Sequence, residues 1–285
     1  MRFDVPWTSK PAWDDLDRRI TAAQEQHLQV ILSLQMAKPP AEAGAVDAGN
    51  TAYTTSLKAW IDRVVEHFKG NGAVLAWMTP EEPETALQLS DSGFRKNIAE
   101  RYRDINLLNR AWGTQYQGFN AISASAVVLM ARQPQFALGL NRAGMDLALY
   151  KQDAFVRLMQ LWARYLRAAD PDRPLLAGAM ARYRCLVSTP EEYDGVVARV
   201  LPGGNGPAAS EAVAIARRGG RFAAIASLPT ASLPDGFRGA LLHGATGIAV
   251  EDWRAVSGNP RLRTLLTQLL ADWRMSGSFS NQPAA

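Results

Sequence analysis

Short apolar runs alternate with longer amphipathic segments along most of this chain, and this rhythm restricts the fold more than any other feature. The runs, such as "QVILSL" at 29–34 and "LLAGAM" at 175–180, are largely apolar on both faces, which is typical of buried parallel strands. One longer segment places its apolar side chains at the 3.6-residue spacing of a helix: Leu57, Trp60, Ile61, Val64, Val65 and Phe68. This repeated order of strand and helix predicts an α/β fold with a parallel sheet.

Seven runs are predicted to be parallel strands of one curved sheet, at residues 2–5, 30–34, 74–77, 175–179, 196–200, 222–226 and 247–250. Eight strands would close a (β/α)8 barrel, which typically takes about 250 residues, and this chain has 285. The alternative is an open doubly wound sheet, but no glycine-rich phosphate-binding turn follows the first strand. We therefore expect an α/β, TIM-barrel-like fold that is incomplete, with about seven strands.

Helices are predicted between these strands, from near residue 13, at 57–69, in two pieces over 92–112, and at 146–169, 208–220, 233–245 and 259–274. Segment 41–56 is predicted to be a loop by its composition, and 120–140 shows no periodicity that would assign it. We expect residues 1–275 to form a single barrel domain and 276–285 to be a disordered tail.

Composition and charge exclude several classes of protein. Hydrophobic residues make up 47% and charged residues 20% of the chain, which is typical of a soluble globular protein, and no apolar run approaches the roughly 20 residues of a membrane helix. The start "MRFDVPWTSK" has neither a basic nor an apolar leader region, so we expect no signal peptide. The net charge is +4, but the arginines are interleaved with acids, and we expect neither a nucleic-acid partner nor a membrane partner.

The residues that most often carry metal or nucleophilic chemistry are sparse. Cys185 is the one cysteine, which excludes an internal disulfide and a cysteine-based zinc site. None of His27, His67 and His243 has a partner at metal-ligand spacing, and no Gly-x-Ser-x-Gly elbow occurs. We therefore expect no metal and no cofactor.

Two motifs and one longer segment point to a family. Segment 94–116, "FRKNIAERYRDINLLNRAWGTQY", contains the pattern Leu-Asn-x-x-Trp-Gly-Thr, and "LLHGATGIAVEDWR" at 241–254 joins His-Gly-Ala to a Trp-Arg pair. Both resemble segments of the family 42 glycoside hydrolases, the β-galactosidase group, as does "WDDLDRRITAAQEQHLQVILSL" at 13–34. Thr246 stands where that family usually has Asp. The resemblance follows nearly the whole chain in order, and it implies a clan A barrel with a carbohydrate ligand.

The resemblance also assigns a role to the acidic pair in "AVLAWMTPEEPE", residues 73–84. Glu82 takes the position of the family's general acid/base, and Glu81 that of an Asn that contacts the sugar. A general acid needs a pKa near neutral pH, and a neighbouring carboxyl raises the pKa of one member of the pair. The alternative is a solvated acidic loop before a helix, where Glu is favoured by the helix dipole.

A second carboxylate is harder to place. The resemblance implies a nucleophilic Glu at the end of the strand in "RFAAIASLP", but positions 225–227 hold no carboxylate. A retaining mechanism needs two carboxyls about 5–5.5 Å apart. The nearest substitutes by position are Glu251 and Asp252, at the end of the next strand. Their alternative role is a structural pair at the rim, or a charge at the start of the last helix.

Three tryptophans and the start of the chain complete the expected site. Trp7, Trp77 and Trp253 are expected at the mouth of the barrel, either as platforms for sugar rings or as core residues. "MRFDVPW" resembles the family's second strand, so the resemblance implies that the first strand and helix are absent. We expect an open edge at 2–5, which favours association into a homo-oligomer unless another segment fills it.

Two functions are compatible with these features. The first is hydrolysis of a β-linked glycoside with Glu82 as general acid/base, which the tryptophans also favour. The second is a catalytically inactive relative that binds carbohydrate or a protein partner, which the missing carboxylate at 225–227 favours.

Overall fold

In the computed structural model of the protein, the described residues are 1–8, 13–35, 43, 45–80, 88–131, 142–180, 192–199, 223–228, 236–237, 240, 245–250, 256 and 258–275. The strands are β1 (Arg2–Pro6), β2 (Val30–Gln35), β3 (Val74–Met78), β4 (Leu175–Met180), β5 (Gly195–Arg199), β6 (Ala223–Leu228) and β7 (Gly247–Val250). The helices are α1 (Asp14–Glu25), α2 (Thr51–Phe68), α4 (Asp91–Tyr102), α5 (Ile105–Trp112), the short 3-10 helix η2 (Phe119–Ala121), α6 (Ala124–Ala131), α7 (Arg142–Ala169) and α11 (Pro260–Met275).

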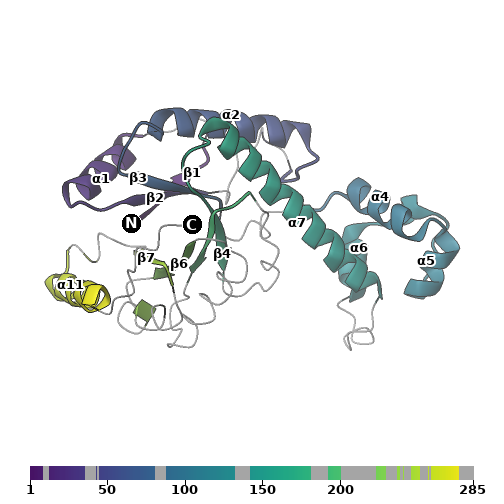
Figure 1. Cartoon of the computed structure of the whole chain (residues 1–285). Coiled ribbons are helices and arrows are strands. Elements are labelled where there is room, and N and C mark those ends of the chain that lie inside the picture. Colours follow the sequence, from purple (N-terminus) through teal and green to yellow (C-terminus); the bar gives the residue numbers. More distant parts are fainter. Residues whose placement is uncertain are drawn as a thin grey trace, which may run out of the picture. The chain divides into compact units, whose positions relative to one another are not determined.

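The strands form one parallel sheet in chain order, from β1 to β7 (Figure 1). Every neighbouring pair is parallel, which confirms the prediction made from the apolar runs. Within the described residues, β1 pairs with β2 and β7 pairs with β6, and no pairing joins β1 to β7. The fold is therefore an incomplete (β/α) barrel, as expected.

The chain divides into two compact units. Unit 1 comprises Met1–Pro40, Lys58–Pro83 and Trp162–Ala285, and it contains the whole sheet. Unit 2 comprises Ala41–Leu57 and Glu84–Leu161, and it contains α4, α5 and α6. Since a compact unit is not by itself an independent domain, a single domain over 1–275 stays a prediction.

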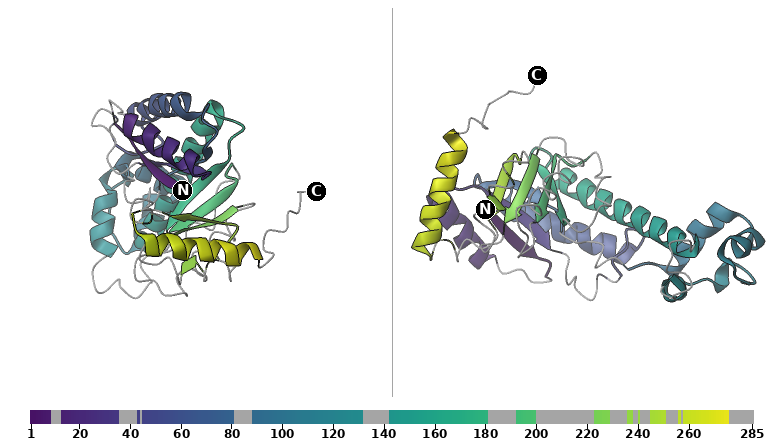
Figure 2. Two further views of the ribbon diagram at one scale, coloured as in Figure 1. Left: turned by 90° about the vertical axis from the view of Figure 1, so that its left-hand side faces the viewer. Right: turned by 90° about the horizontal axis from the view of Figure 1, so that it is seen from below.

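In unit 1, helices cover the outer face of the sheet. Successive strand residues point to opposite faces, and Phe3 and Val5 of β1 are buried on the face that meets the helices. The Arg19 guanidinium of α1 lies 4.3 Å from the ring centre of Phe3. Figures 1 and 2 show α1 and α2 beside the β1–β3 part of the sheet, and α11 beside β6 and β7.

Part of the inner face of the sheet is apolar. Ile31, Ala76, Met78, Leu176 and Val197 come from four neighbouring strands and form one buried cluster. This packing is typical of a barrel interior, which is filled by side chains.

Unit 2 has a hydrophobic core of its own. Its buried members come from α4 to α7 and their connections: Phe94, Ile98, Leu108, Trp112, Ile122, Ala124, Val127, Ala143, Leu147 and Tyr150. Two predicted helices, α4 and α5, lie where the sequence placed them, within 92–112 to one residue.

Three boundaries differ from the predictions, and local capping explains two of them. Residues 51–56 are helical rather than a loop, because Asn50 Oδ1 accepts hydrogen bonds from the first backbone N–H groups of α2. Residues 124–131 form α6, whose start is capped by Ser123 Oγ and by the Asp91 carboxylate. Helix α7 begins at Arg142 rather than at 146. The predicted helix at 208–220 and the tail lie outside the described residues.

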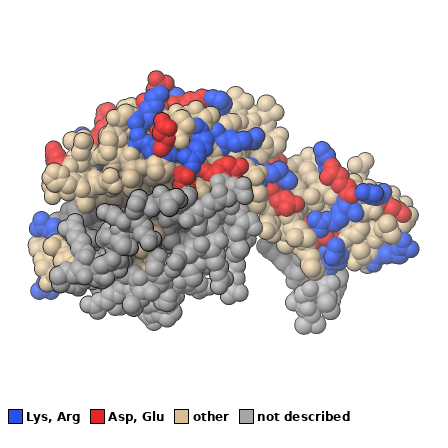
Figure 3. Space-filling model, viewed as in Figure 1, with Lys and Arg blue, Asp and Glu red and all other residues tan. Residues whose placement is uncertain are grey.

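Charged side chains of both signs are interspersed on the face of the molecule shown in Figure 3. None of the helices in the described part of the chain is long and apolar enough to span a membrane.

Candidate functional site

The carboxyl ends of the strands are where parallel barrels carry their chemistry, and β3 leads there into the acidic pair. The two residues that follow β3, Thr79 and Pro80, are buried. The Thr79 N–H donates to the Leu176 carbonyl at 3.0 Å, and its Oγ1 accepts from the Gly178 N–H at 3.3 Å. The end of β3 is thus fixed against β4 at Thr79, two residues before Glu81.

Gly178 makes this close approach feasible. A Cβ at this position would lie 2.5 Å from the Thr79 carbonyl oxygen and 2.8 Å from that of Pro80. Both are backbone atoms, so any side chain here would force the end of β3 away from β4. The glycine is therefore needed for the path that the chain takes into the acidic pair.

Tyr193, just before β5, also contacts the end of β3. Its side chain is buried and hydrogen-bonds the Thr79 side chain. Burial raises the pKa of Tyr193 far above its usual value, so the phenol stays protonated.

A polar cluster occupies the inner face of β1 and β2. Arg2 Nη2 lies 3.1 Å from Asp4 Oδ1, and Gln35 Nε2 donates to that same oxygen at 2.9 Å. Gln35 Nε2 also lies 2.9 Å from Ser33 Oγ, and Ser33 pairs with Asp4 in the strand register. We name this group, Arg2, Asp4, Ser33 and Gln35, the inner polar cluster.

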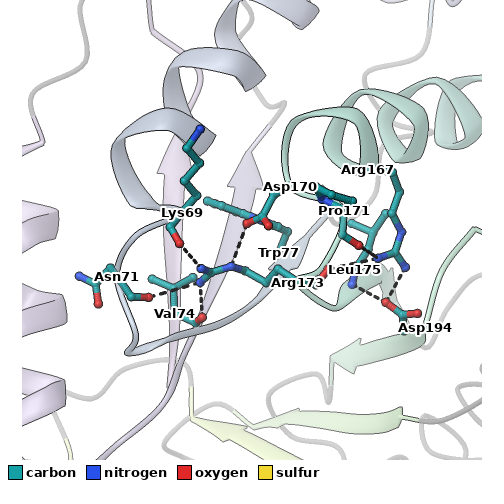
Figure 4. Close-up of polar contacts among 10 residues, drawn as sticks. All are labelled: Lys69, Asn71, Val74, Trp77, Arg167, Asp170, Pro171, Arg173, Leu175 and Asp194. Atoms are coloured by element: carbon teal, nitrogen blue, oxygen red, sulfur yellow. Dashed lines mark hydrogen bonds and ion pairs between the residues drawn. The ribbon is translucent and has the colours of Figure 1, made fainter.

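At the opposite end of the strands, Arg173 holds the start of β3 and β4 together (Figure 4). Its guanidinium donates to the carbonyl oxygens of Lys69, Asn71 and Val74, and Nε lies 2.9 Å from the Asp170 carboxylate. Both charged side chains are 13% exposed, so the pair is largely desolvated and depends on these added hydrogen bonds.

Trp77 belongs to this same network. Its indole N–H donates to Asp170 Oδ2 at 2.9 Å, and the Arg173 guanidinium lies 5.6 Å from the ring centre (Figure 4). The side chain is 1% exposed. The described contacts of Trp77 are thus structural, and its role as a sugar platform stays a prediction.

Arg167, at the end of α7, makes a similar set of hydrogen bonds to residues next to β4 and β5. Its Nη2 lies 2.6 Å from Asp194 Oδ2, which also accepts the Leu175 N–H at 2.7 Å (Figure 4). The same guanidinium donates to the Glu192 carbonyl. These bonds order the amino ends of the strands, where barrels carry stability rather than chemistry.

Trp7 lies one residue past β1, in a cluster of three indoles. Its ring stacks on Trp60 with centres 5.2 Å apart and meets Trp162 edge-on at 6.4 Å. Trp7 is 5% exposed, so it contributes to the core on the helix side of the sheet. Its predicted contact with a sugar stays a prediction.

The residues of the pattern Leu-Asn-x-x-Trp-Gly-Thr form the C-terminal cap of α5 in unit 2. Gly113 takes the left-handed conformation at the end of α5, with φ of 67°. Asn109 Oδ1 accepts hydrogen bonds from Thr114 Oγ1 and from the Tyr116 N–H. Trp112 donates its indole N–H to the buried Asp146 carboxylate at 2.9 Å.

An open hollow of about 590 Å³ lies beside this motif, lined by Ile105, Asn106, Asn109, Arg110 and residues 113–117.

The remaining predicted site residues, Glu81, Glu82, Glu251, Asp252 and Trp253, lie outside the described residues. Among the residues that are described, no group of three or more His, Cys, Asp or Glu side chains could hold a metal ion. The inner polar cluster was not predicted from the sequence. Its signal was a polar residue at every second position of a strand, as in Arg2 and Asp4, or Ser33 and Gln35.

Comparison with known proteins identifies a family. Residues 37–196 match the family model Glyco_hydro_42, described as Beta-galactosidase. The β-galactosidase Bga of Halorubrum lacusprofundi is 30% identical over 146 residues, which are 47% of this chain and 20% of that protein. The β-galactosidase LacZ of Heyndrickxia coagulans is 21% identical over 129 residues, 44% of this chain and 19% of that protein.

Solved structures agree on the fold. The β-galactosidase of Marinomonas ef1 superposes with a TM-score of 0.65 at 19% identity, covering 86% of this chain and 47% of that one. The β-amylase catalytic domain of Paenibacillus polymyxa reaches 0.63 at 12% identity, covering 87% and 84%. The chain thus spans about half of that solved β-galactosidase, and its aligned part is about a fifth of the curated relatives.

Proposed function

This chain belongs to glycoside hydrolase family 42, and on that premise we propose that it hydrolyses a β-linked galactoside with Glu82 as general acid/base. The sugar is taken from its relatives, which are named β-galactosidases. The family match carries the proposal, because residues 37–196 include β3 and the acidic pair that follows it.

The described end of β3 supports this assignment. Thr79 and Pro80 are buried and Thr79 is hydrogen-bonded to β4, so the acidic pair follows a fixed residue at the carboxyl edge of the sheet. Catalysis depends strongly on position, since a misplacement of about 1 Å can cost roughly a hundredfold in rate. Gly178 and Thr79 therefore serve as positioning residues for Glu82.

The chemistry assigned to Glu82 is proton transfer. Its carboxylic acid would protonate the glycosidic oxygen as the bond to the anomeric carbon breaks, and its carboxylate would then take a proton from water. A second carboxylate must supply the nucleophile or activate that water, and Glu251 or Asp252 is proposed for this role. A separation of about 5–5.5 Å would give retention of configuration, and about 6.5–9.5 Å would give inversion.

One observation favours a second function, in which the chain binds a carbohydrate or a protein partner without turnover. By resemblance, strand β6 takes the place of the strand that carries the nucleophile in the family, but it reads Ala-Ala-Ile-Ala-Ser-Leu and contains no carboxylate. Without a second carboxylate within reach, the barrel would keep its affinity for a sugar but lose hydrolysis.

The test is hydrolysis of p-nitrophenyl β-glycosides by the full chain and by Glu82→Gln, with Glu66→Gln on the exposed side of α2 as the matched control. We expect Glu82→Gln to lower kcat/KM about 10²- to 10⁴-fold, the usual contribution of a general acid. The loss should be much smaller for 2,4-dinitrophenyl β-galactoside, whose leaving group needs no protonation. An unchanged rate in Glu82→Gln would contradict the assignment, and binding of methyl β-galactoside without any turnover would establish the second function.

A further inference from the structure

We propose that Asp4 and Gln35 form a sugar-binding subsite, in which Asp4 Oδ2 and Gln35 Oε1 accept hydrogen bonds from two neighbouring hydroxyls of the glycoside. This inference rests on the proposed function, because it assumes that a carbohydrate enters the barrel. It assigns substrate contacts to β1 and β2, two strands to which the sequence argument gave none apart from Trp7 near the end of β1.

The strand geometry places this pair on the inner face. Side chains alternate along a strand, and the neighbours Phe3 and Val5 are buried on the helix side, 4% and 0% exposed. Asp4 therefore points to the other face, next to Ser33, its partner in register. Gln35 lies two residues further along β2, towards the carboxyl ends of the strands where barrels bind their substrates.

Hydrogen bonding within the cluster leaves two acceptors without a partner among the described residues. Both contacts of Asp4 with described residues, from Arg2 and from Gln35, end on Oδ1, so Oδ2 has no partner in the described part of the chain. Gln35 Nε2 donates to Asp4 and to Ser33, and its Oε1 has no partner among the residues that the structure describes. The Asp4 side chain is 57% exposed, although Ser33 beside it is fully buried. A ligand can therefore reach Asp4 without displacing the protein around it.

The chemistry of these acceptors fits a sugar. Two oxygens held by fixed donors can each accept a hydrogen bond from one of two adjacent hydroxyls, and bonds to a charged carboxylate are among the stronger ones in proteins. Asp is disfavoured in strands, so its presence inside β1 favours a role other than strand formation. Arg2, 7% exposed, fixes the carboxylate in place.

A rival explanation is protection of an edge. An inward-pointing charge on an edge strand discourages pairing with another chain, and β1 pairs only with β2 in the described part of the protein. The two explanations differ in what the charge acts on. A subsite residue changes the affinity for a sugar, and a protective residue changes the association of the chain with itself.

The experiment is calorimetric titration of the full chain with methyl β-galactoside and with its monodeoxy analogues. We expect Asp4→Asn to weaken binding of methyl β-galactoside about ten- to a hundredfold, the effect of removing a charged hydrogen bond. The loss should disappear for the one analogue that lacks the hydroxyl bound by Asp4. Gln35→Met should behave in the same way with the neighbouring hydroxyl. Asp62→Asn, on the exposed side of α2, is the matched control and should bind as the unchanged chain does.

Each other outcome is decisive. An equal loss for the parent glycoside and all its analogues would show a structural role and overturn the subsite. Unchanged affinity together with increased light scattering in Asp4→Asn would establish edge protection instead. If the unchanged chain hydrolyses or binds the glycoside and both variants do so equally well, only this inference fails. If the unchanged chain neither binds nor hydrolyses any β-glycoside, the proposed function fails and the subsite with it.

Discussion

At the scale of single residues, the buried Asp146 carboxylate in unit 2 depends on several hydrogen-bond donors. It is fully buried and receives Arg101 Nη1 at 2.9 Å, Tyr102 OH at 2.5 Å and Trp112 Nε1 at 2.9 Å, with Arg142 Nε at 3.4 Å. Removing the carboxylate leaves these donors without an acceptor. We therefore expect Asp146→Ala to lower the free energy of unfolding by about 3–5 kcal/mol in urea titrations.

The matched control for this substitution is Asp62→Ala. Asp62 pairs with Lys58 on the exposed side of α2, and such surface pairs contribute about 0–1 kcal/mol. Equal effects of the two substitutions would contradict the prediction. Since Trp112 of the family pattern bonds Asp146, that pattern identifies the fold of unit 2 rather than a reacting group.

Three tyrosines make the stability of the protein sensitive to alkaline pH. Burial raises the pKa of Tyr102, Tyr150 and Tyr193, and the hydrogen bond to Asp146 adds to the effect at Tyr102. The unfolded chain therefore loses its phenolic protons first as pH rises past about 10, and stability falls from that pH upwards. Urea midpoints at pH 8 to 11 should show this decline, and Tyr102→Phe should reduce its slope. A midpoint that is constant over this range would refute the assignment.

At the scale of elements, the contact between β3 and β4 depends on Gly178. A methyl group there would meet backbone oxygens of Thr79 and Pro80, which cannot rotate away. We expect Gly178→Ala to destabilise the protein by about 1–3 kcal/mol, as overpacking does. It should also lower kcat/KM on p-nitrophenyl β-galactoside at temperatures where the variant is still folded, because Glu82 follows directly.

Gly72→Ala is the control for this substitution, since no atom lies within 4 Å of its added Cβ. Its unfolding free energy should stay within about 0.5 kcal/mol of the unchanged chain. A Gly178→Ala variant with unchanged unfolding and unchanged kinetics would show that the ends of β3 and β4 separate freely.

The elements that sequence predicts well are those whose signal is local. Apolar runs gave all seven strands, because a buried parallel strand needs little beyond its own composition. The start of α2 was missed because Asn50 was taken as a loop residue, although it caps the helix. Asp4 and Gln35 were missed for a different reason. They meet only when β1 and β2 pair, and their spacing of 31 residues carries no local signal.

At the scale of the whole molecule, the sheet predicts self-association. No pairing joins β1 to β7 among the described residues, and an unpaired strand edge is a template for another chain. We expect light scattering to show species larger than the 31.1 kDa monomer, in proportions that rise with concentration. A constant mass of one chain over a hundredfold range of concentration would show that both edges are covered.

The indole cluster on the helix side of β1 has an optical consequence. Trp7 and Trp60 are nearly parallel, with ring planes 13° apart and centres separated by 5.2 Å, so their electronic transitions are coupled. The fluorescence emission of such a stacked pair depends on how the two rings are held. Because β1 carries Asp4 on one face and leads directly to Trp7, we expect a sugar bound at Asp4 to shift the tryptophan emission. We therefore expect the indole pair to report occupancy of the proposed subsite without any added label.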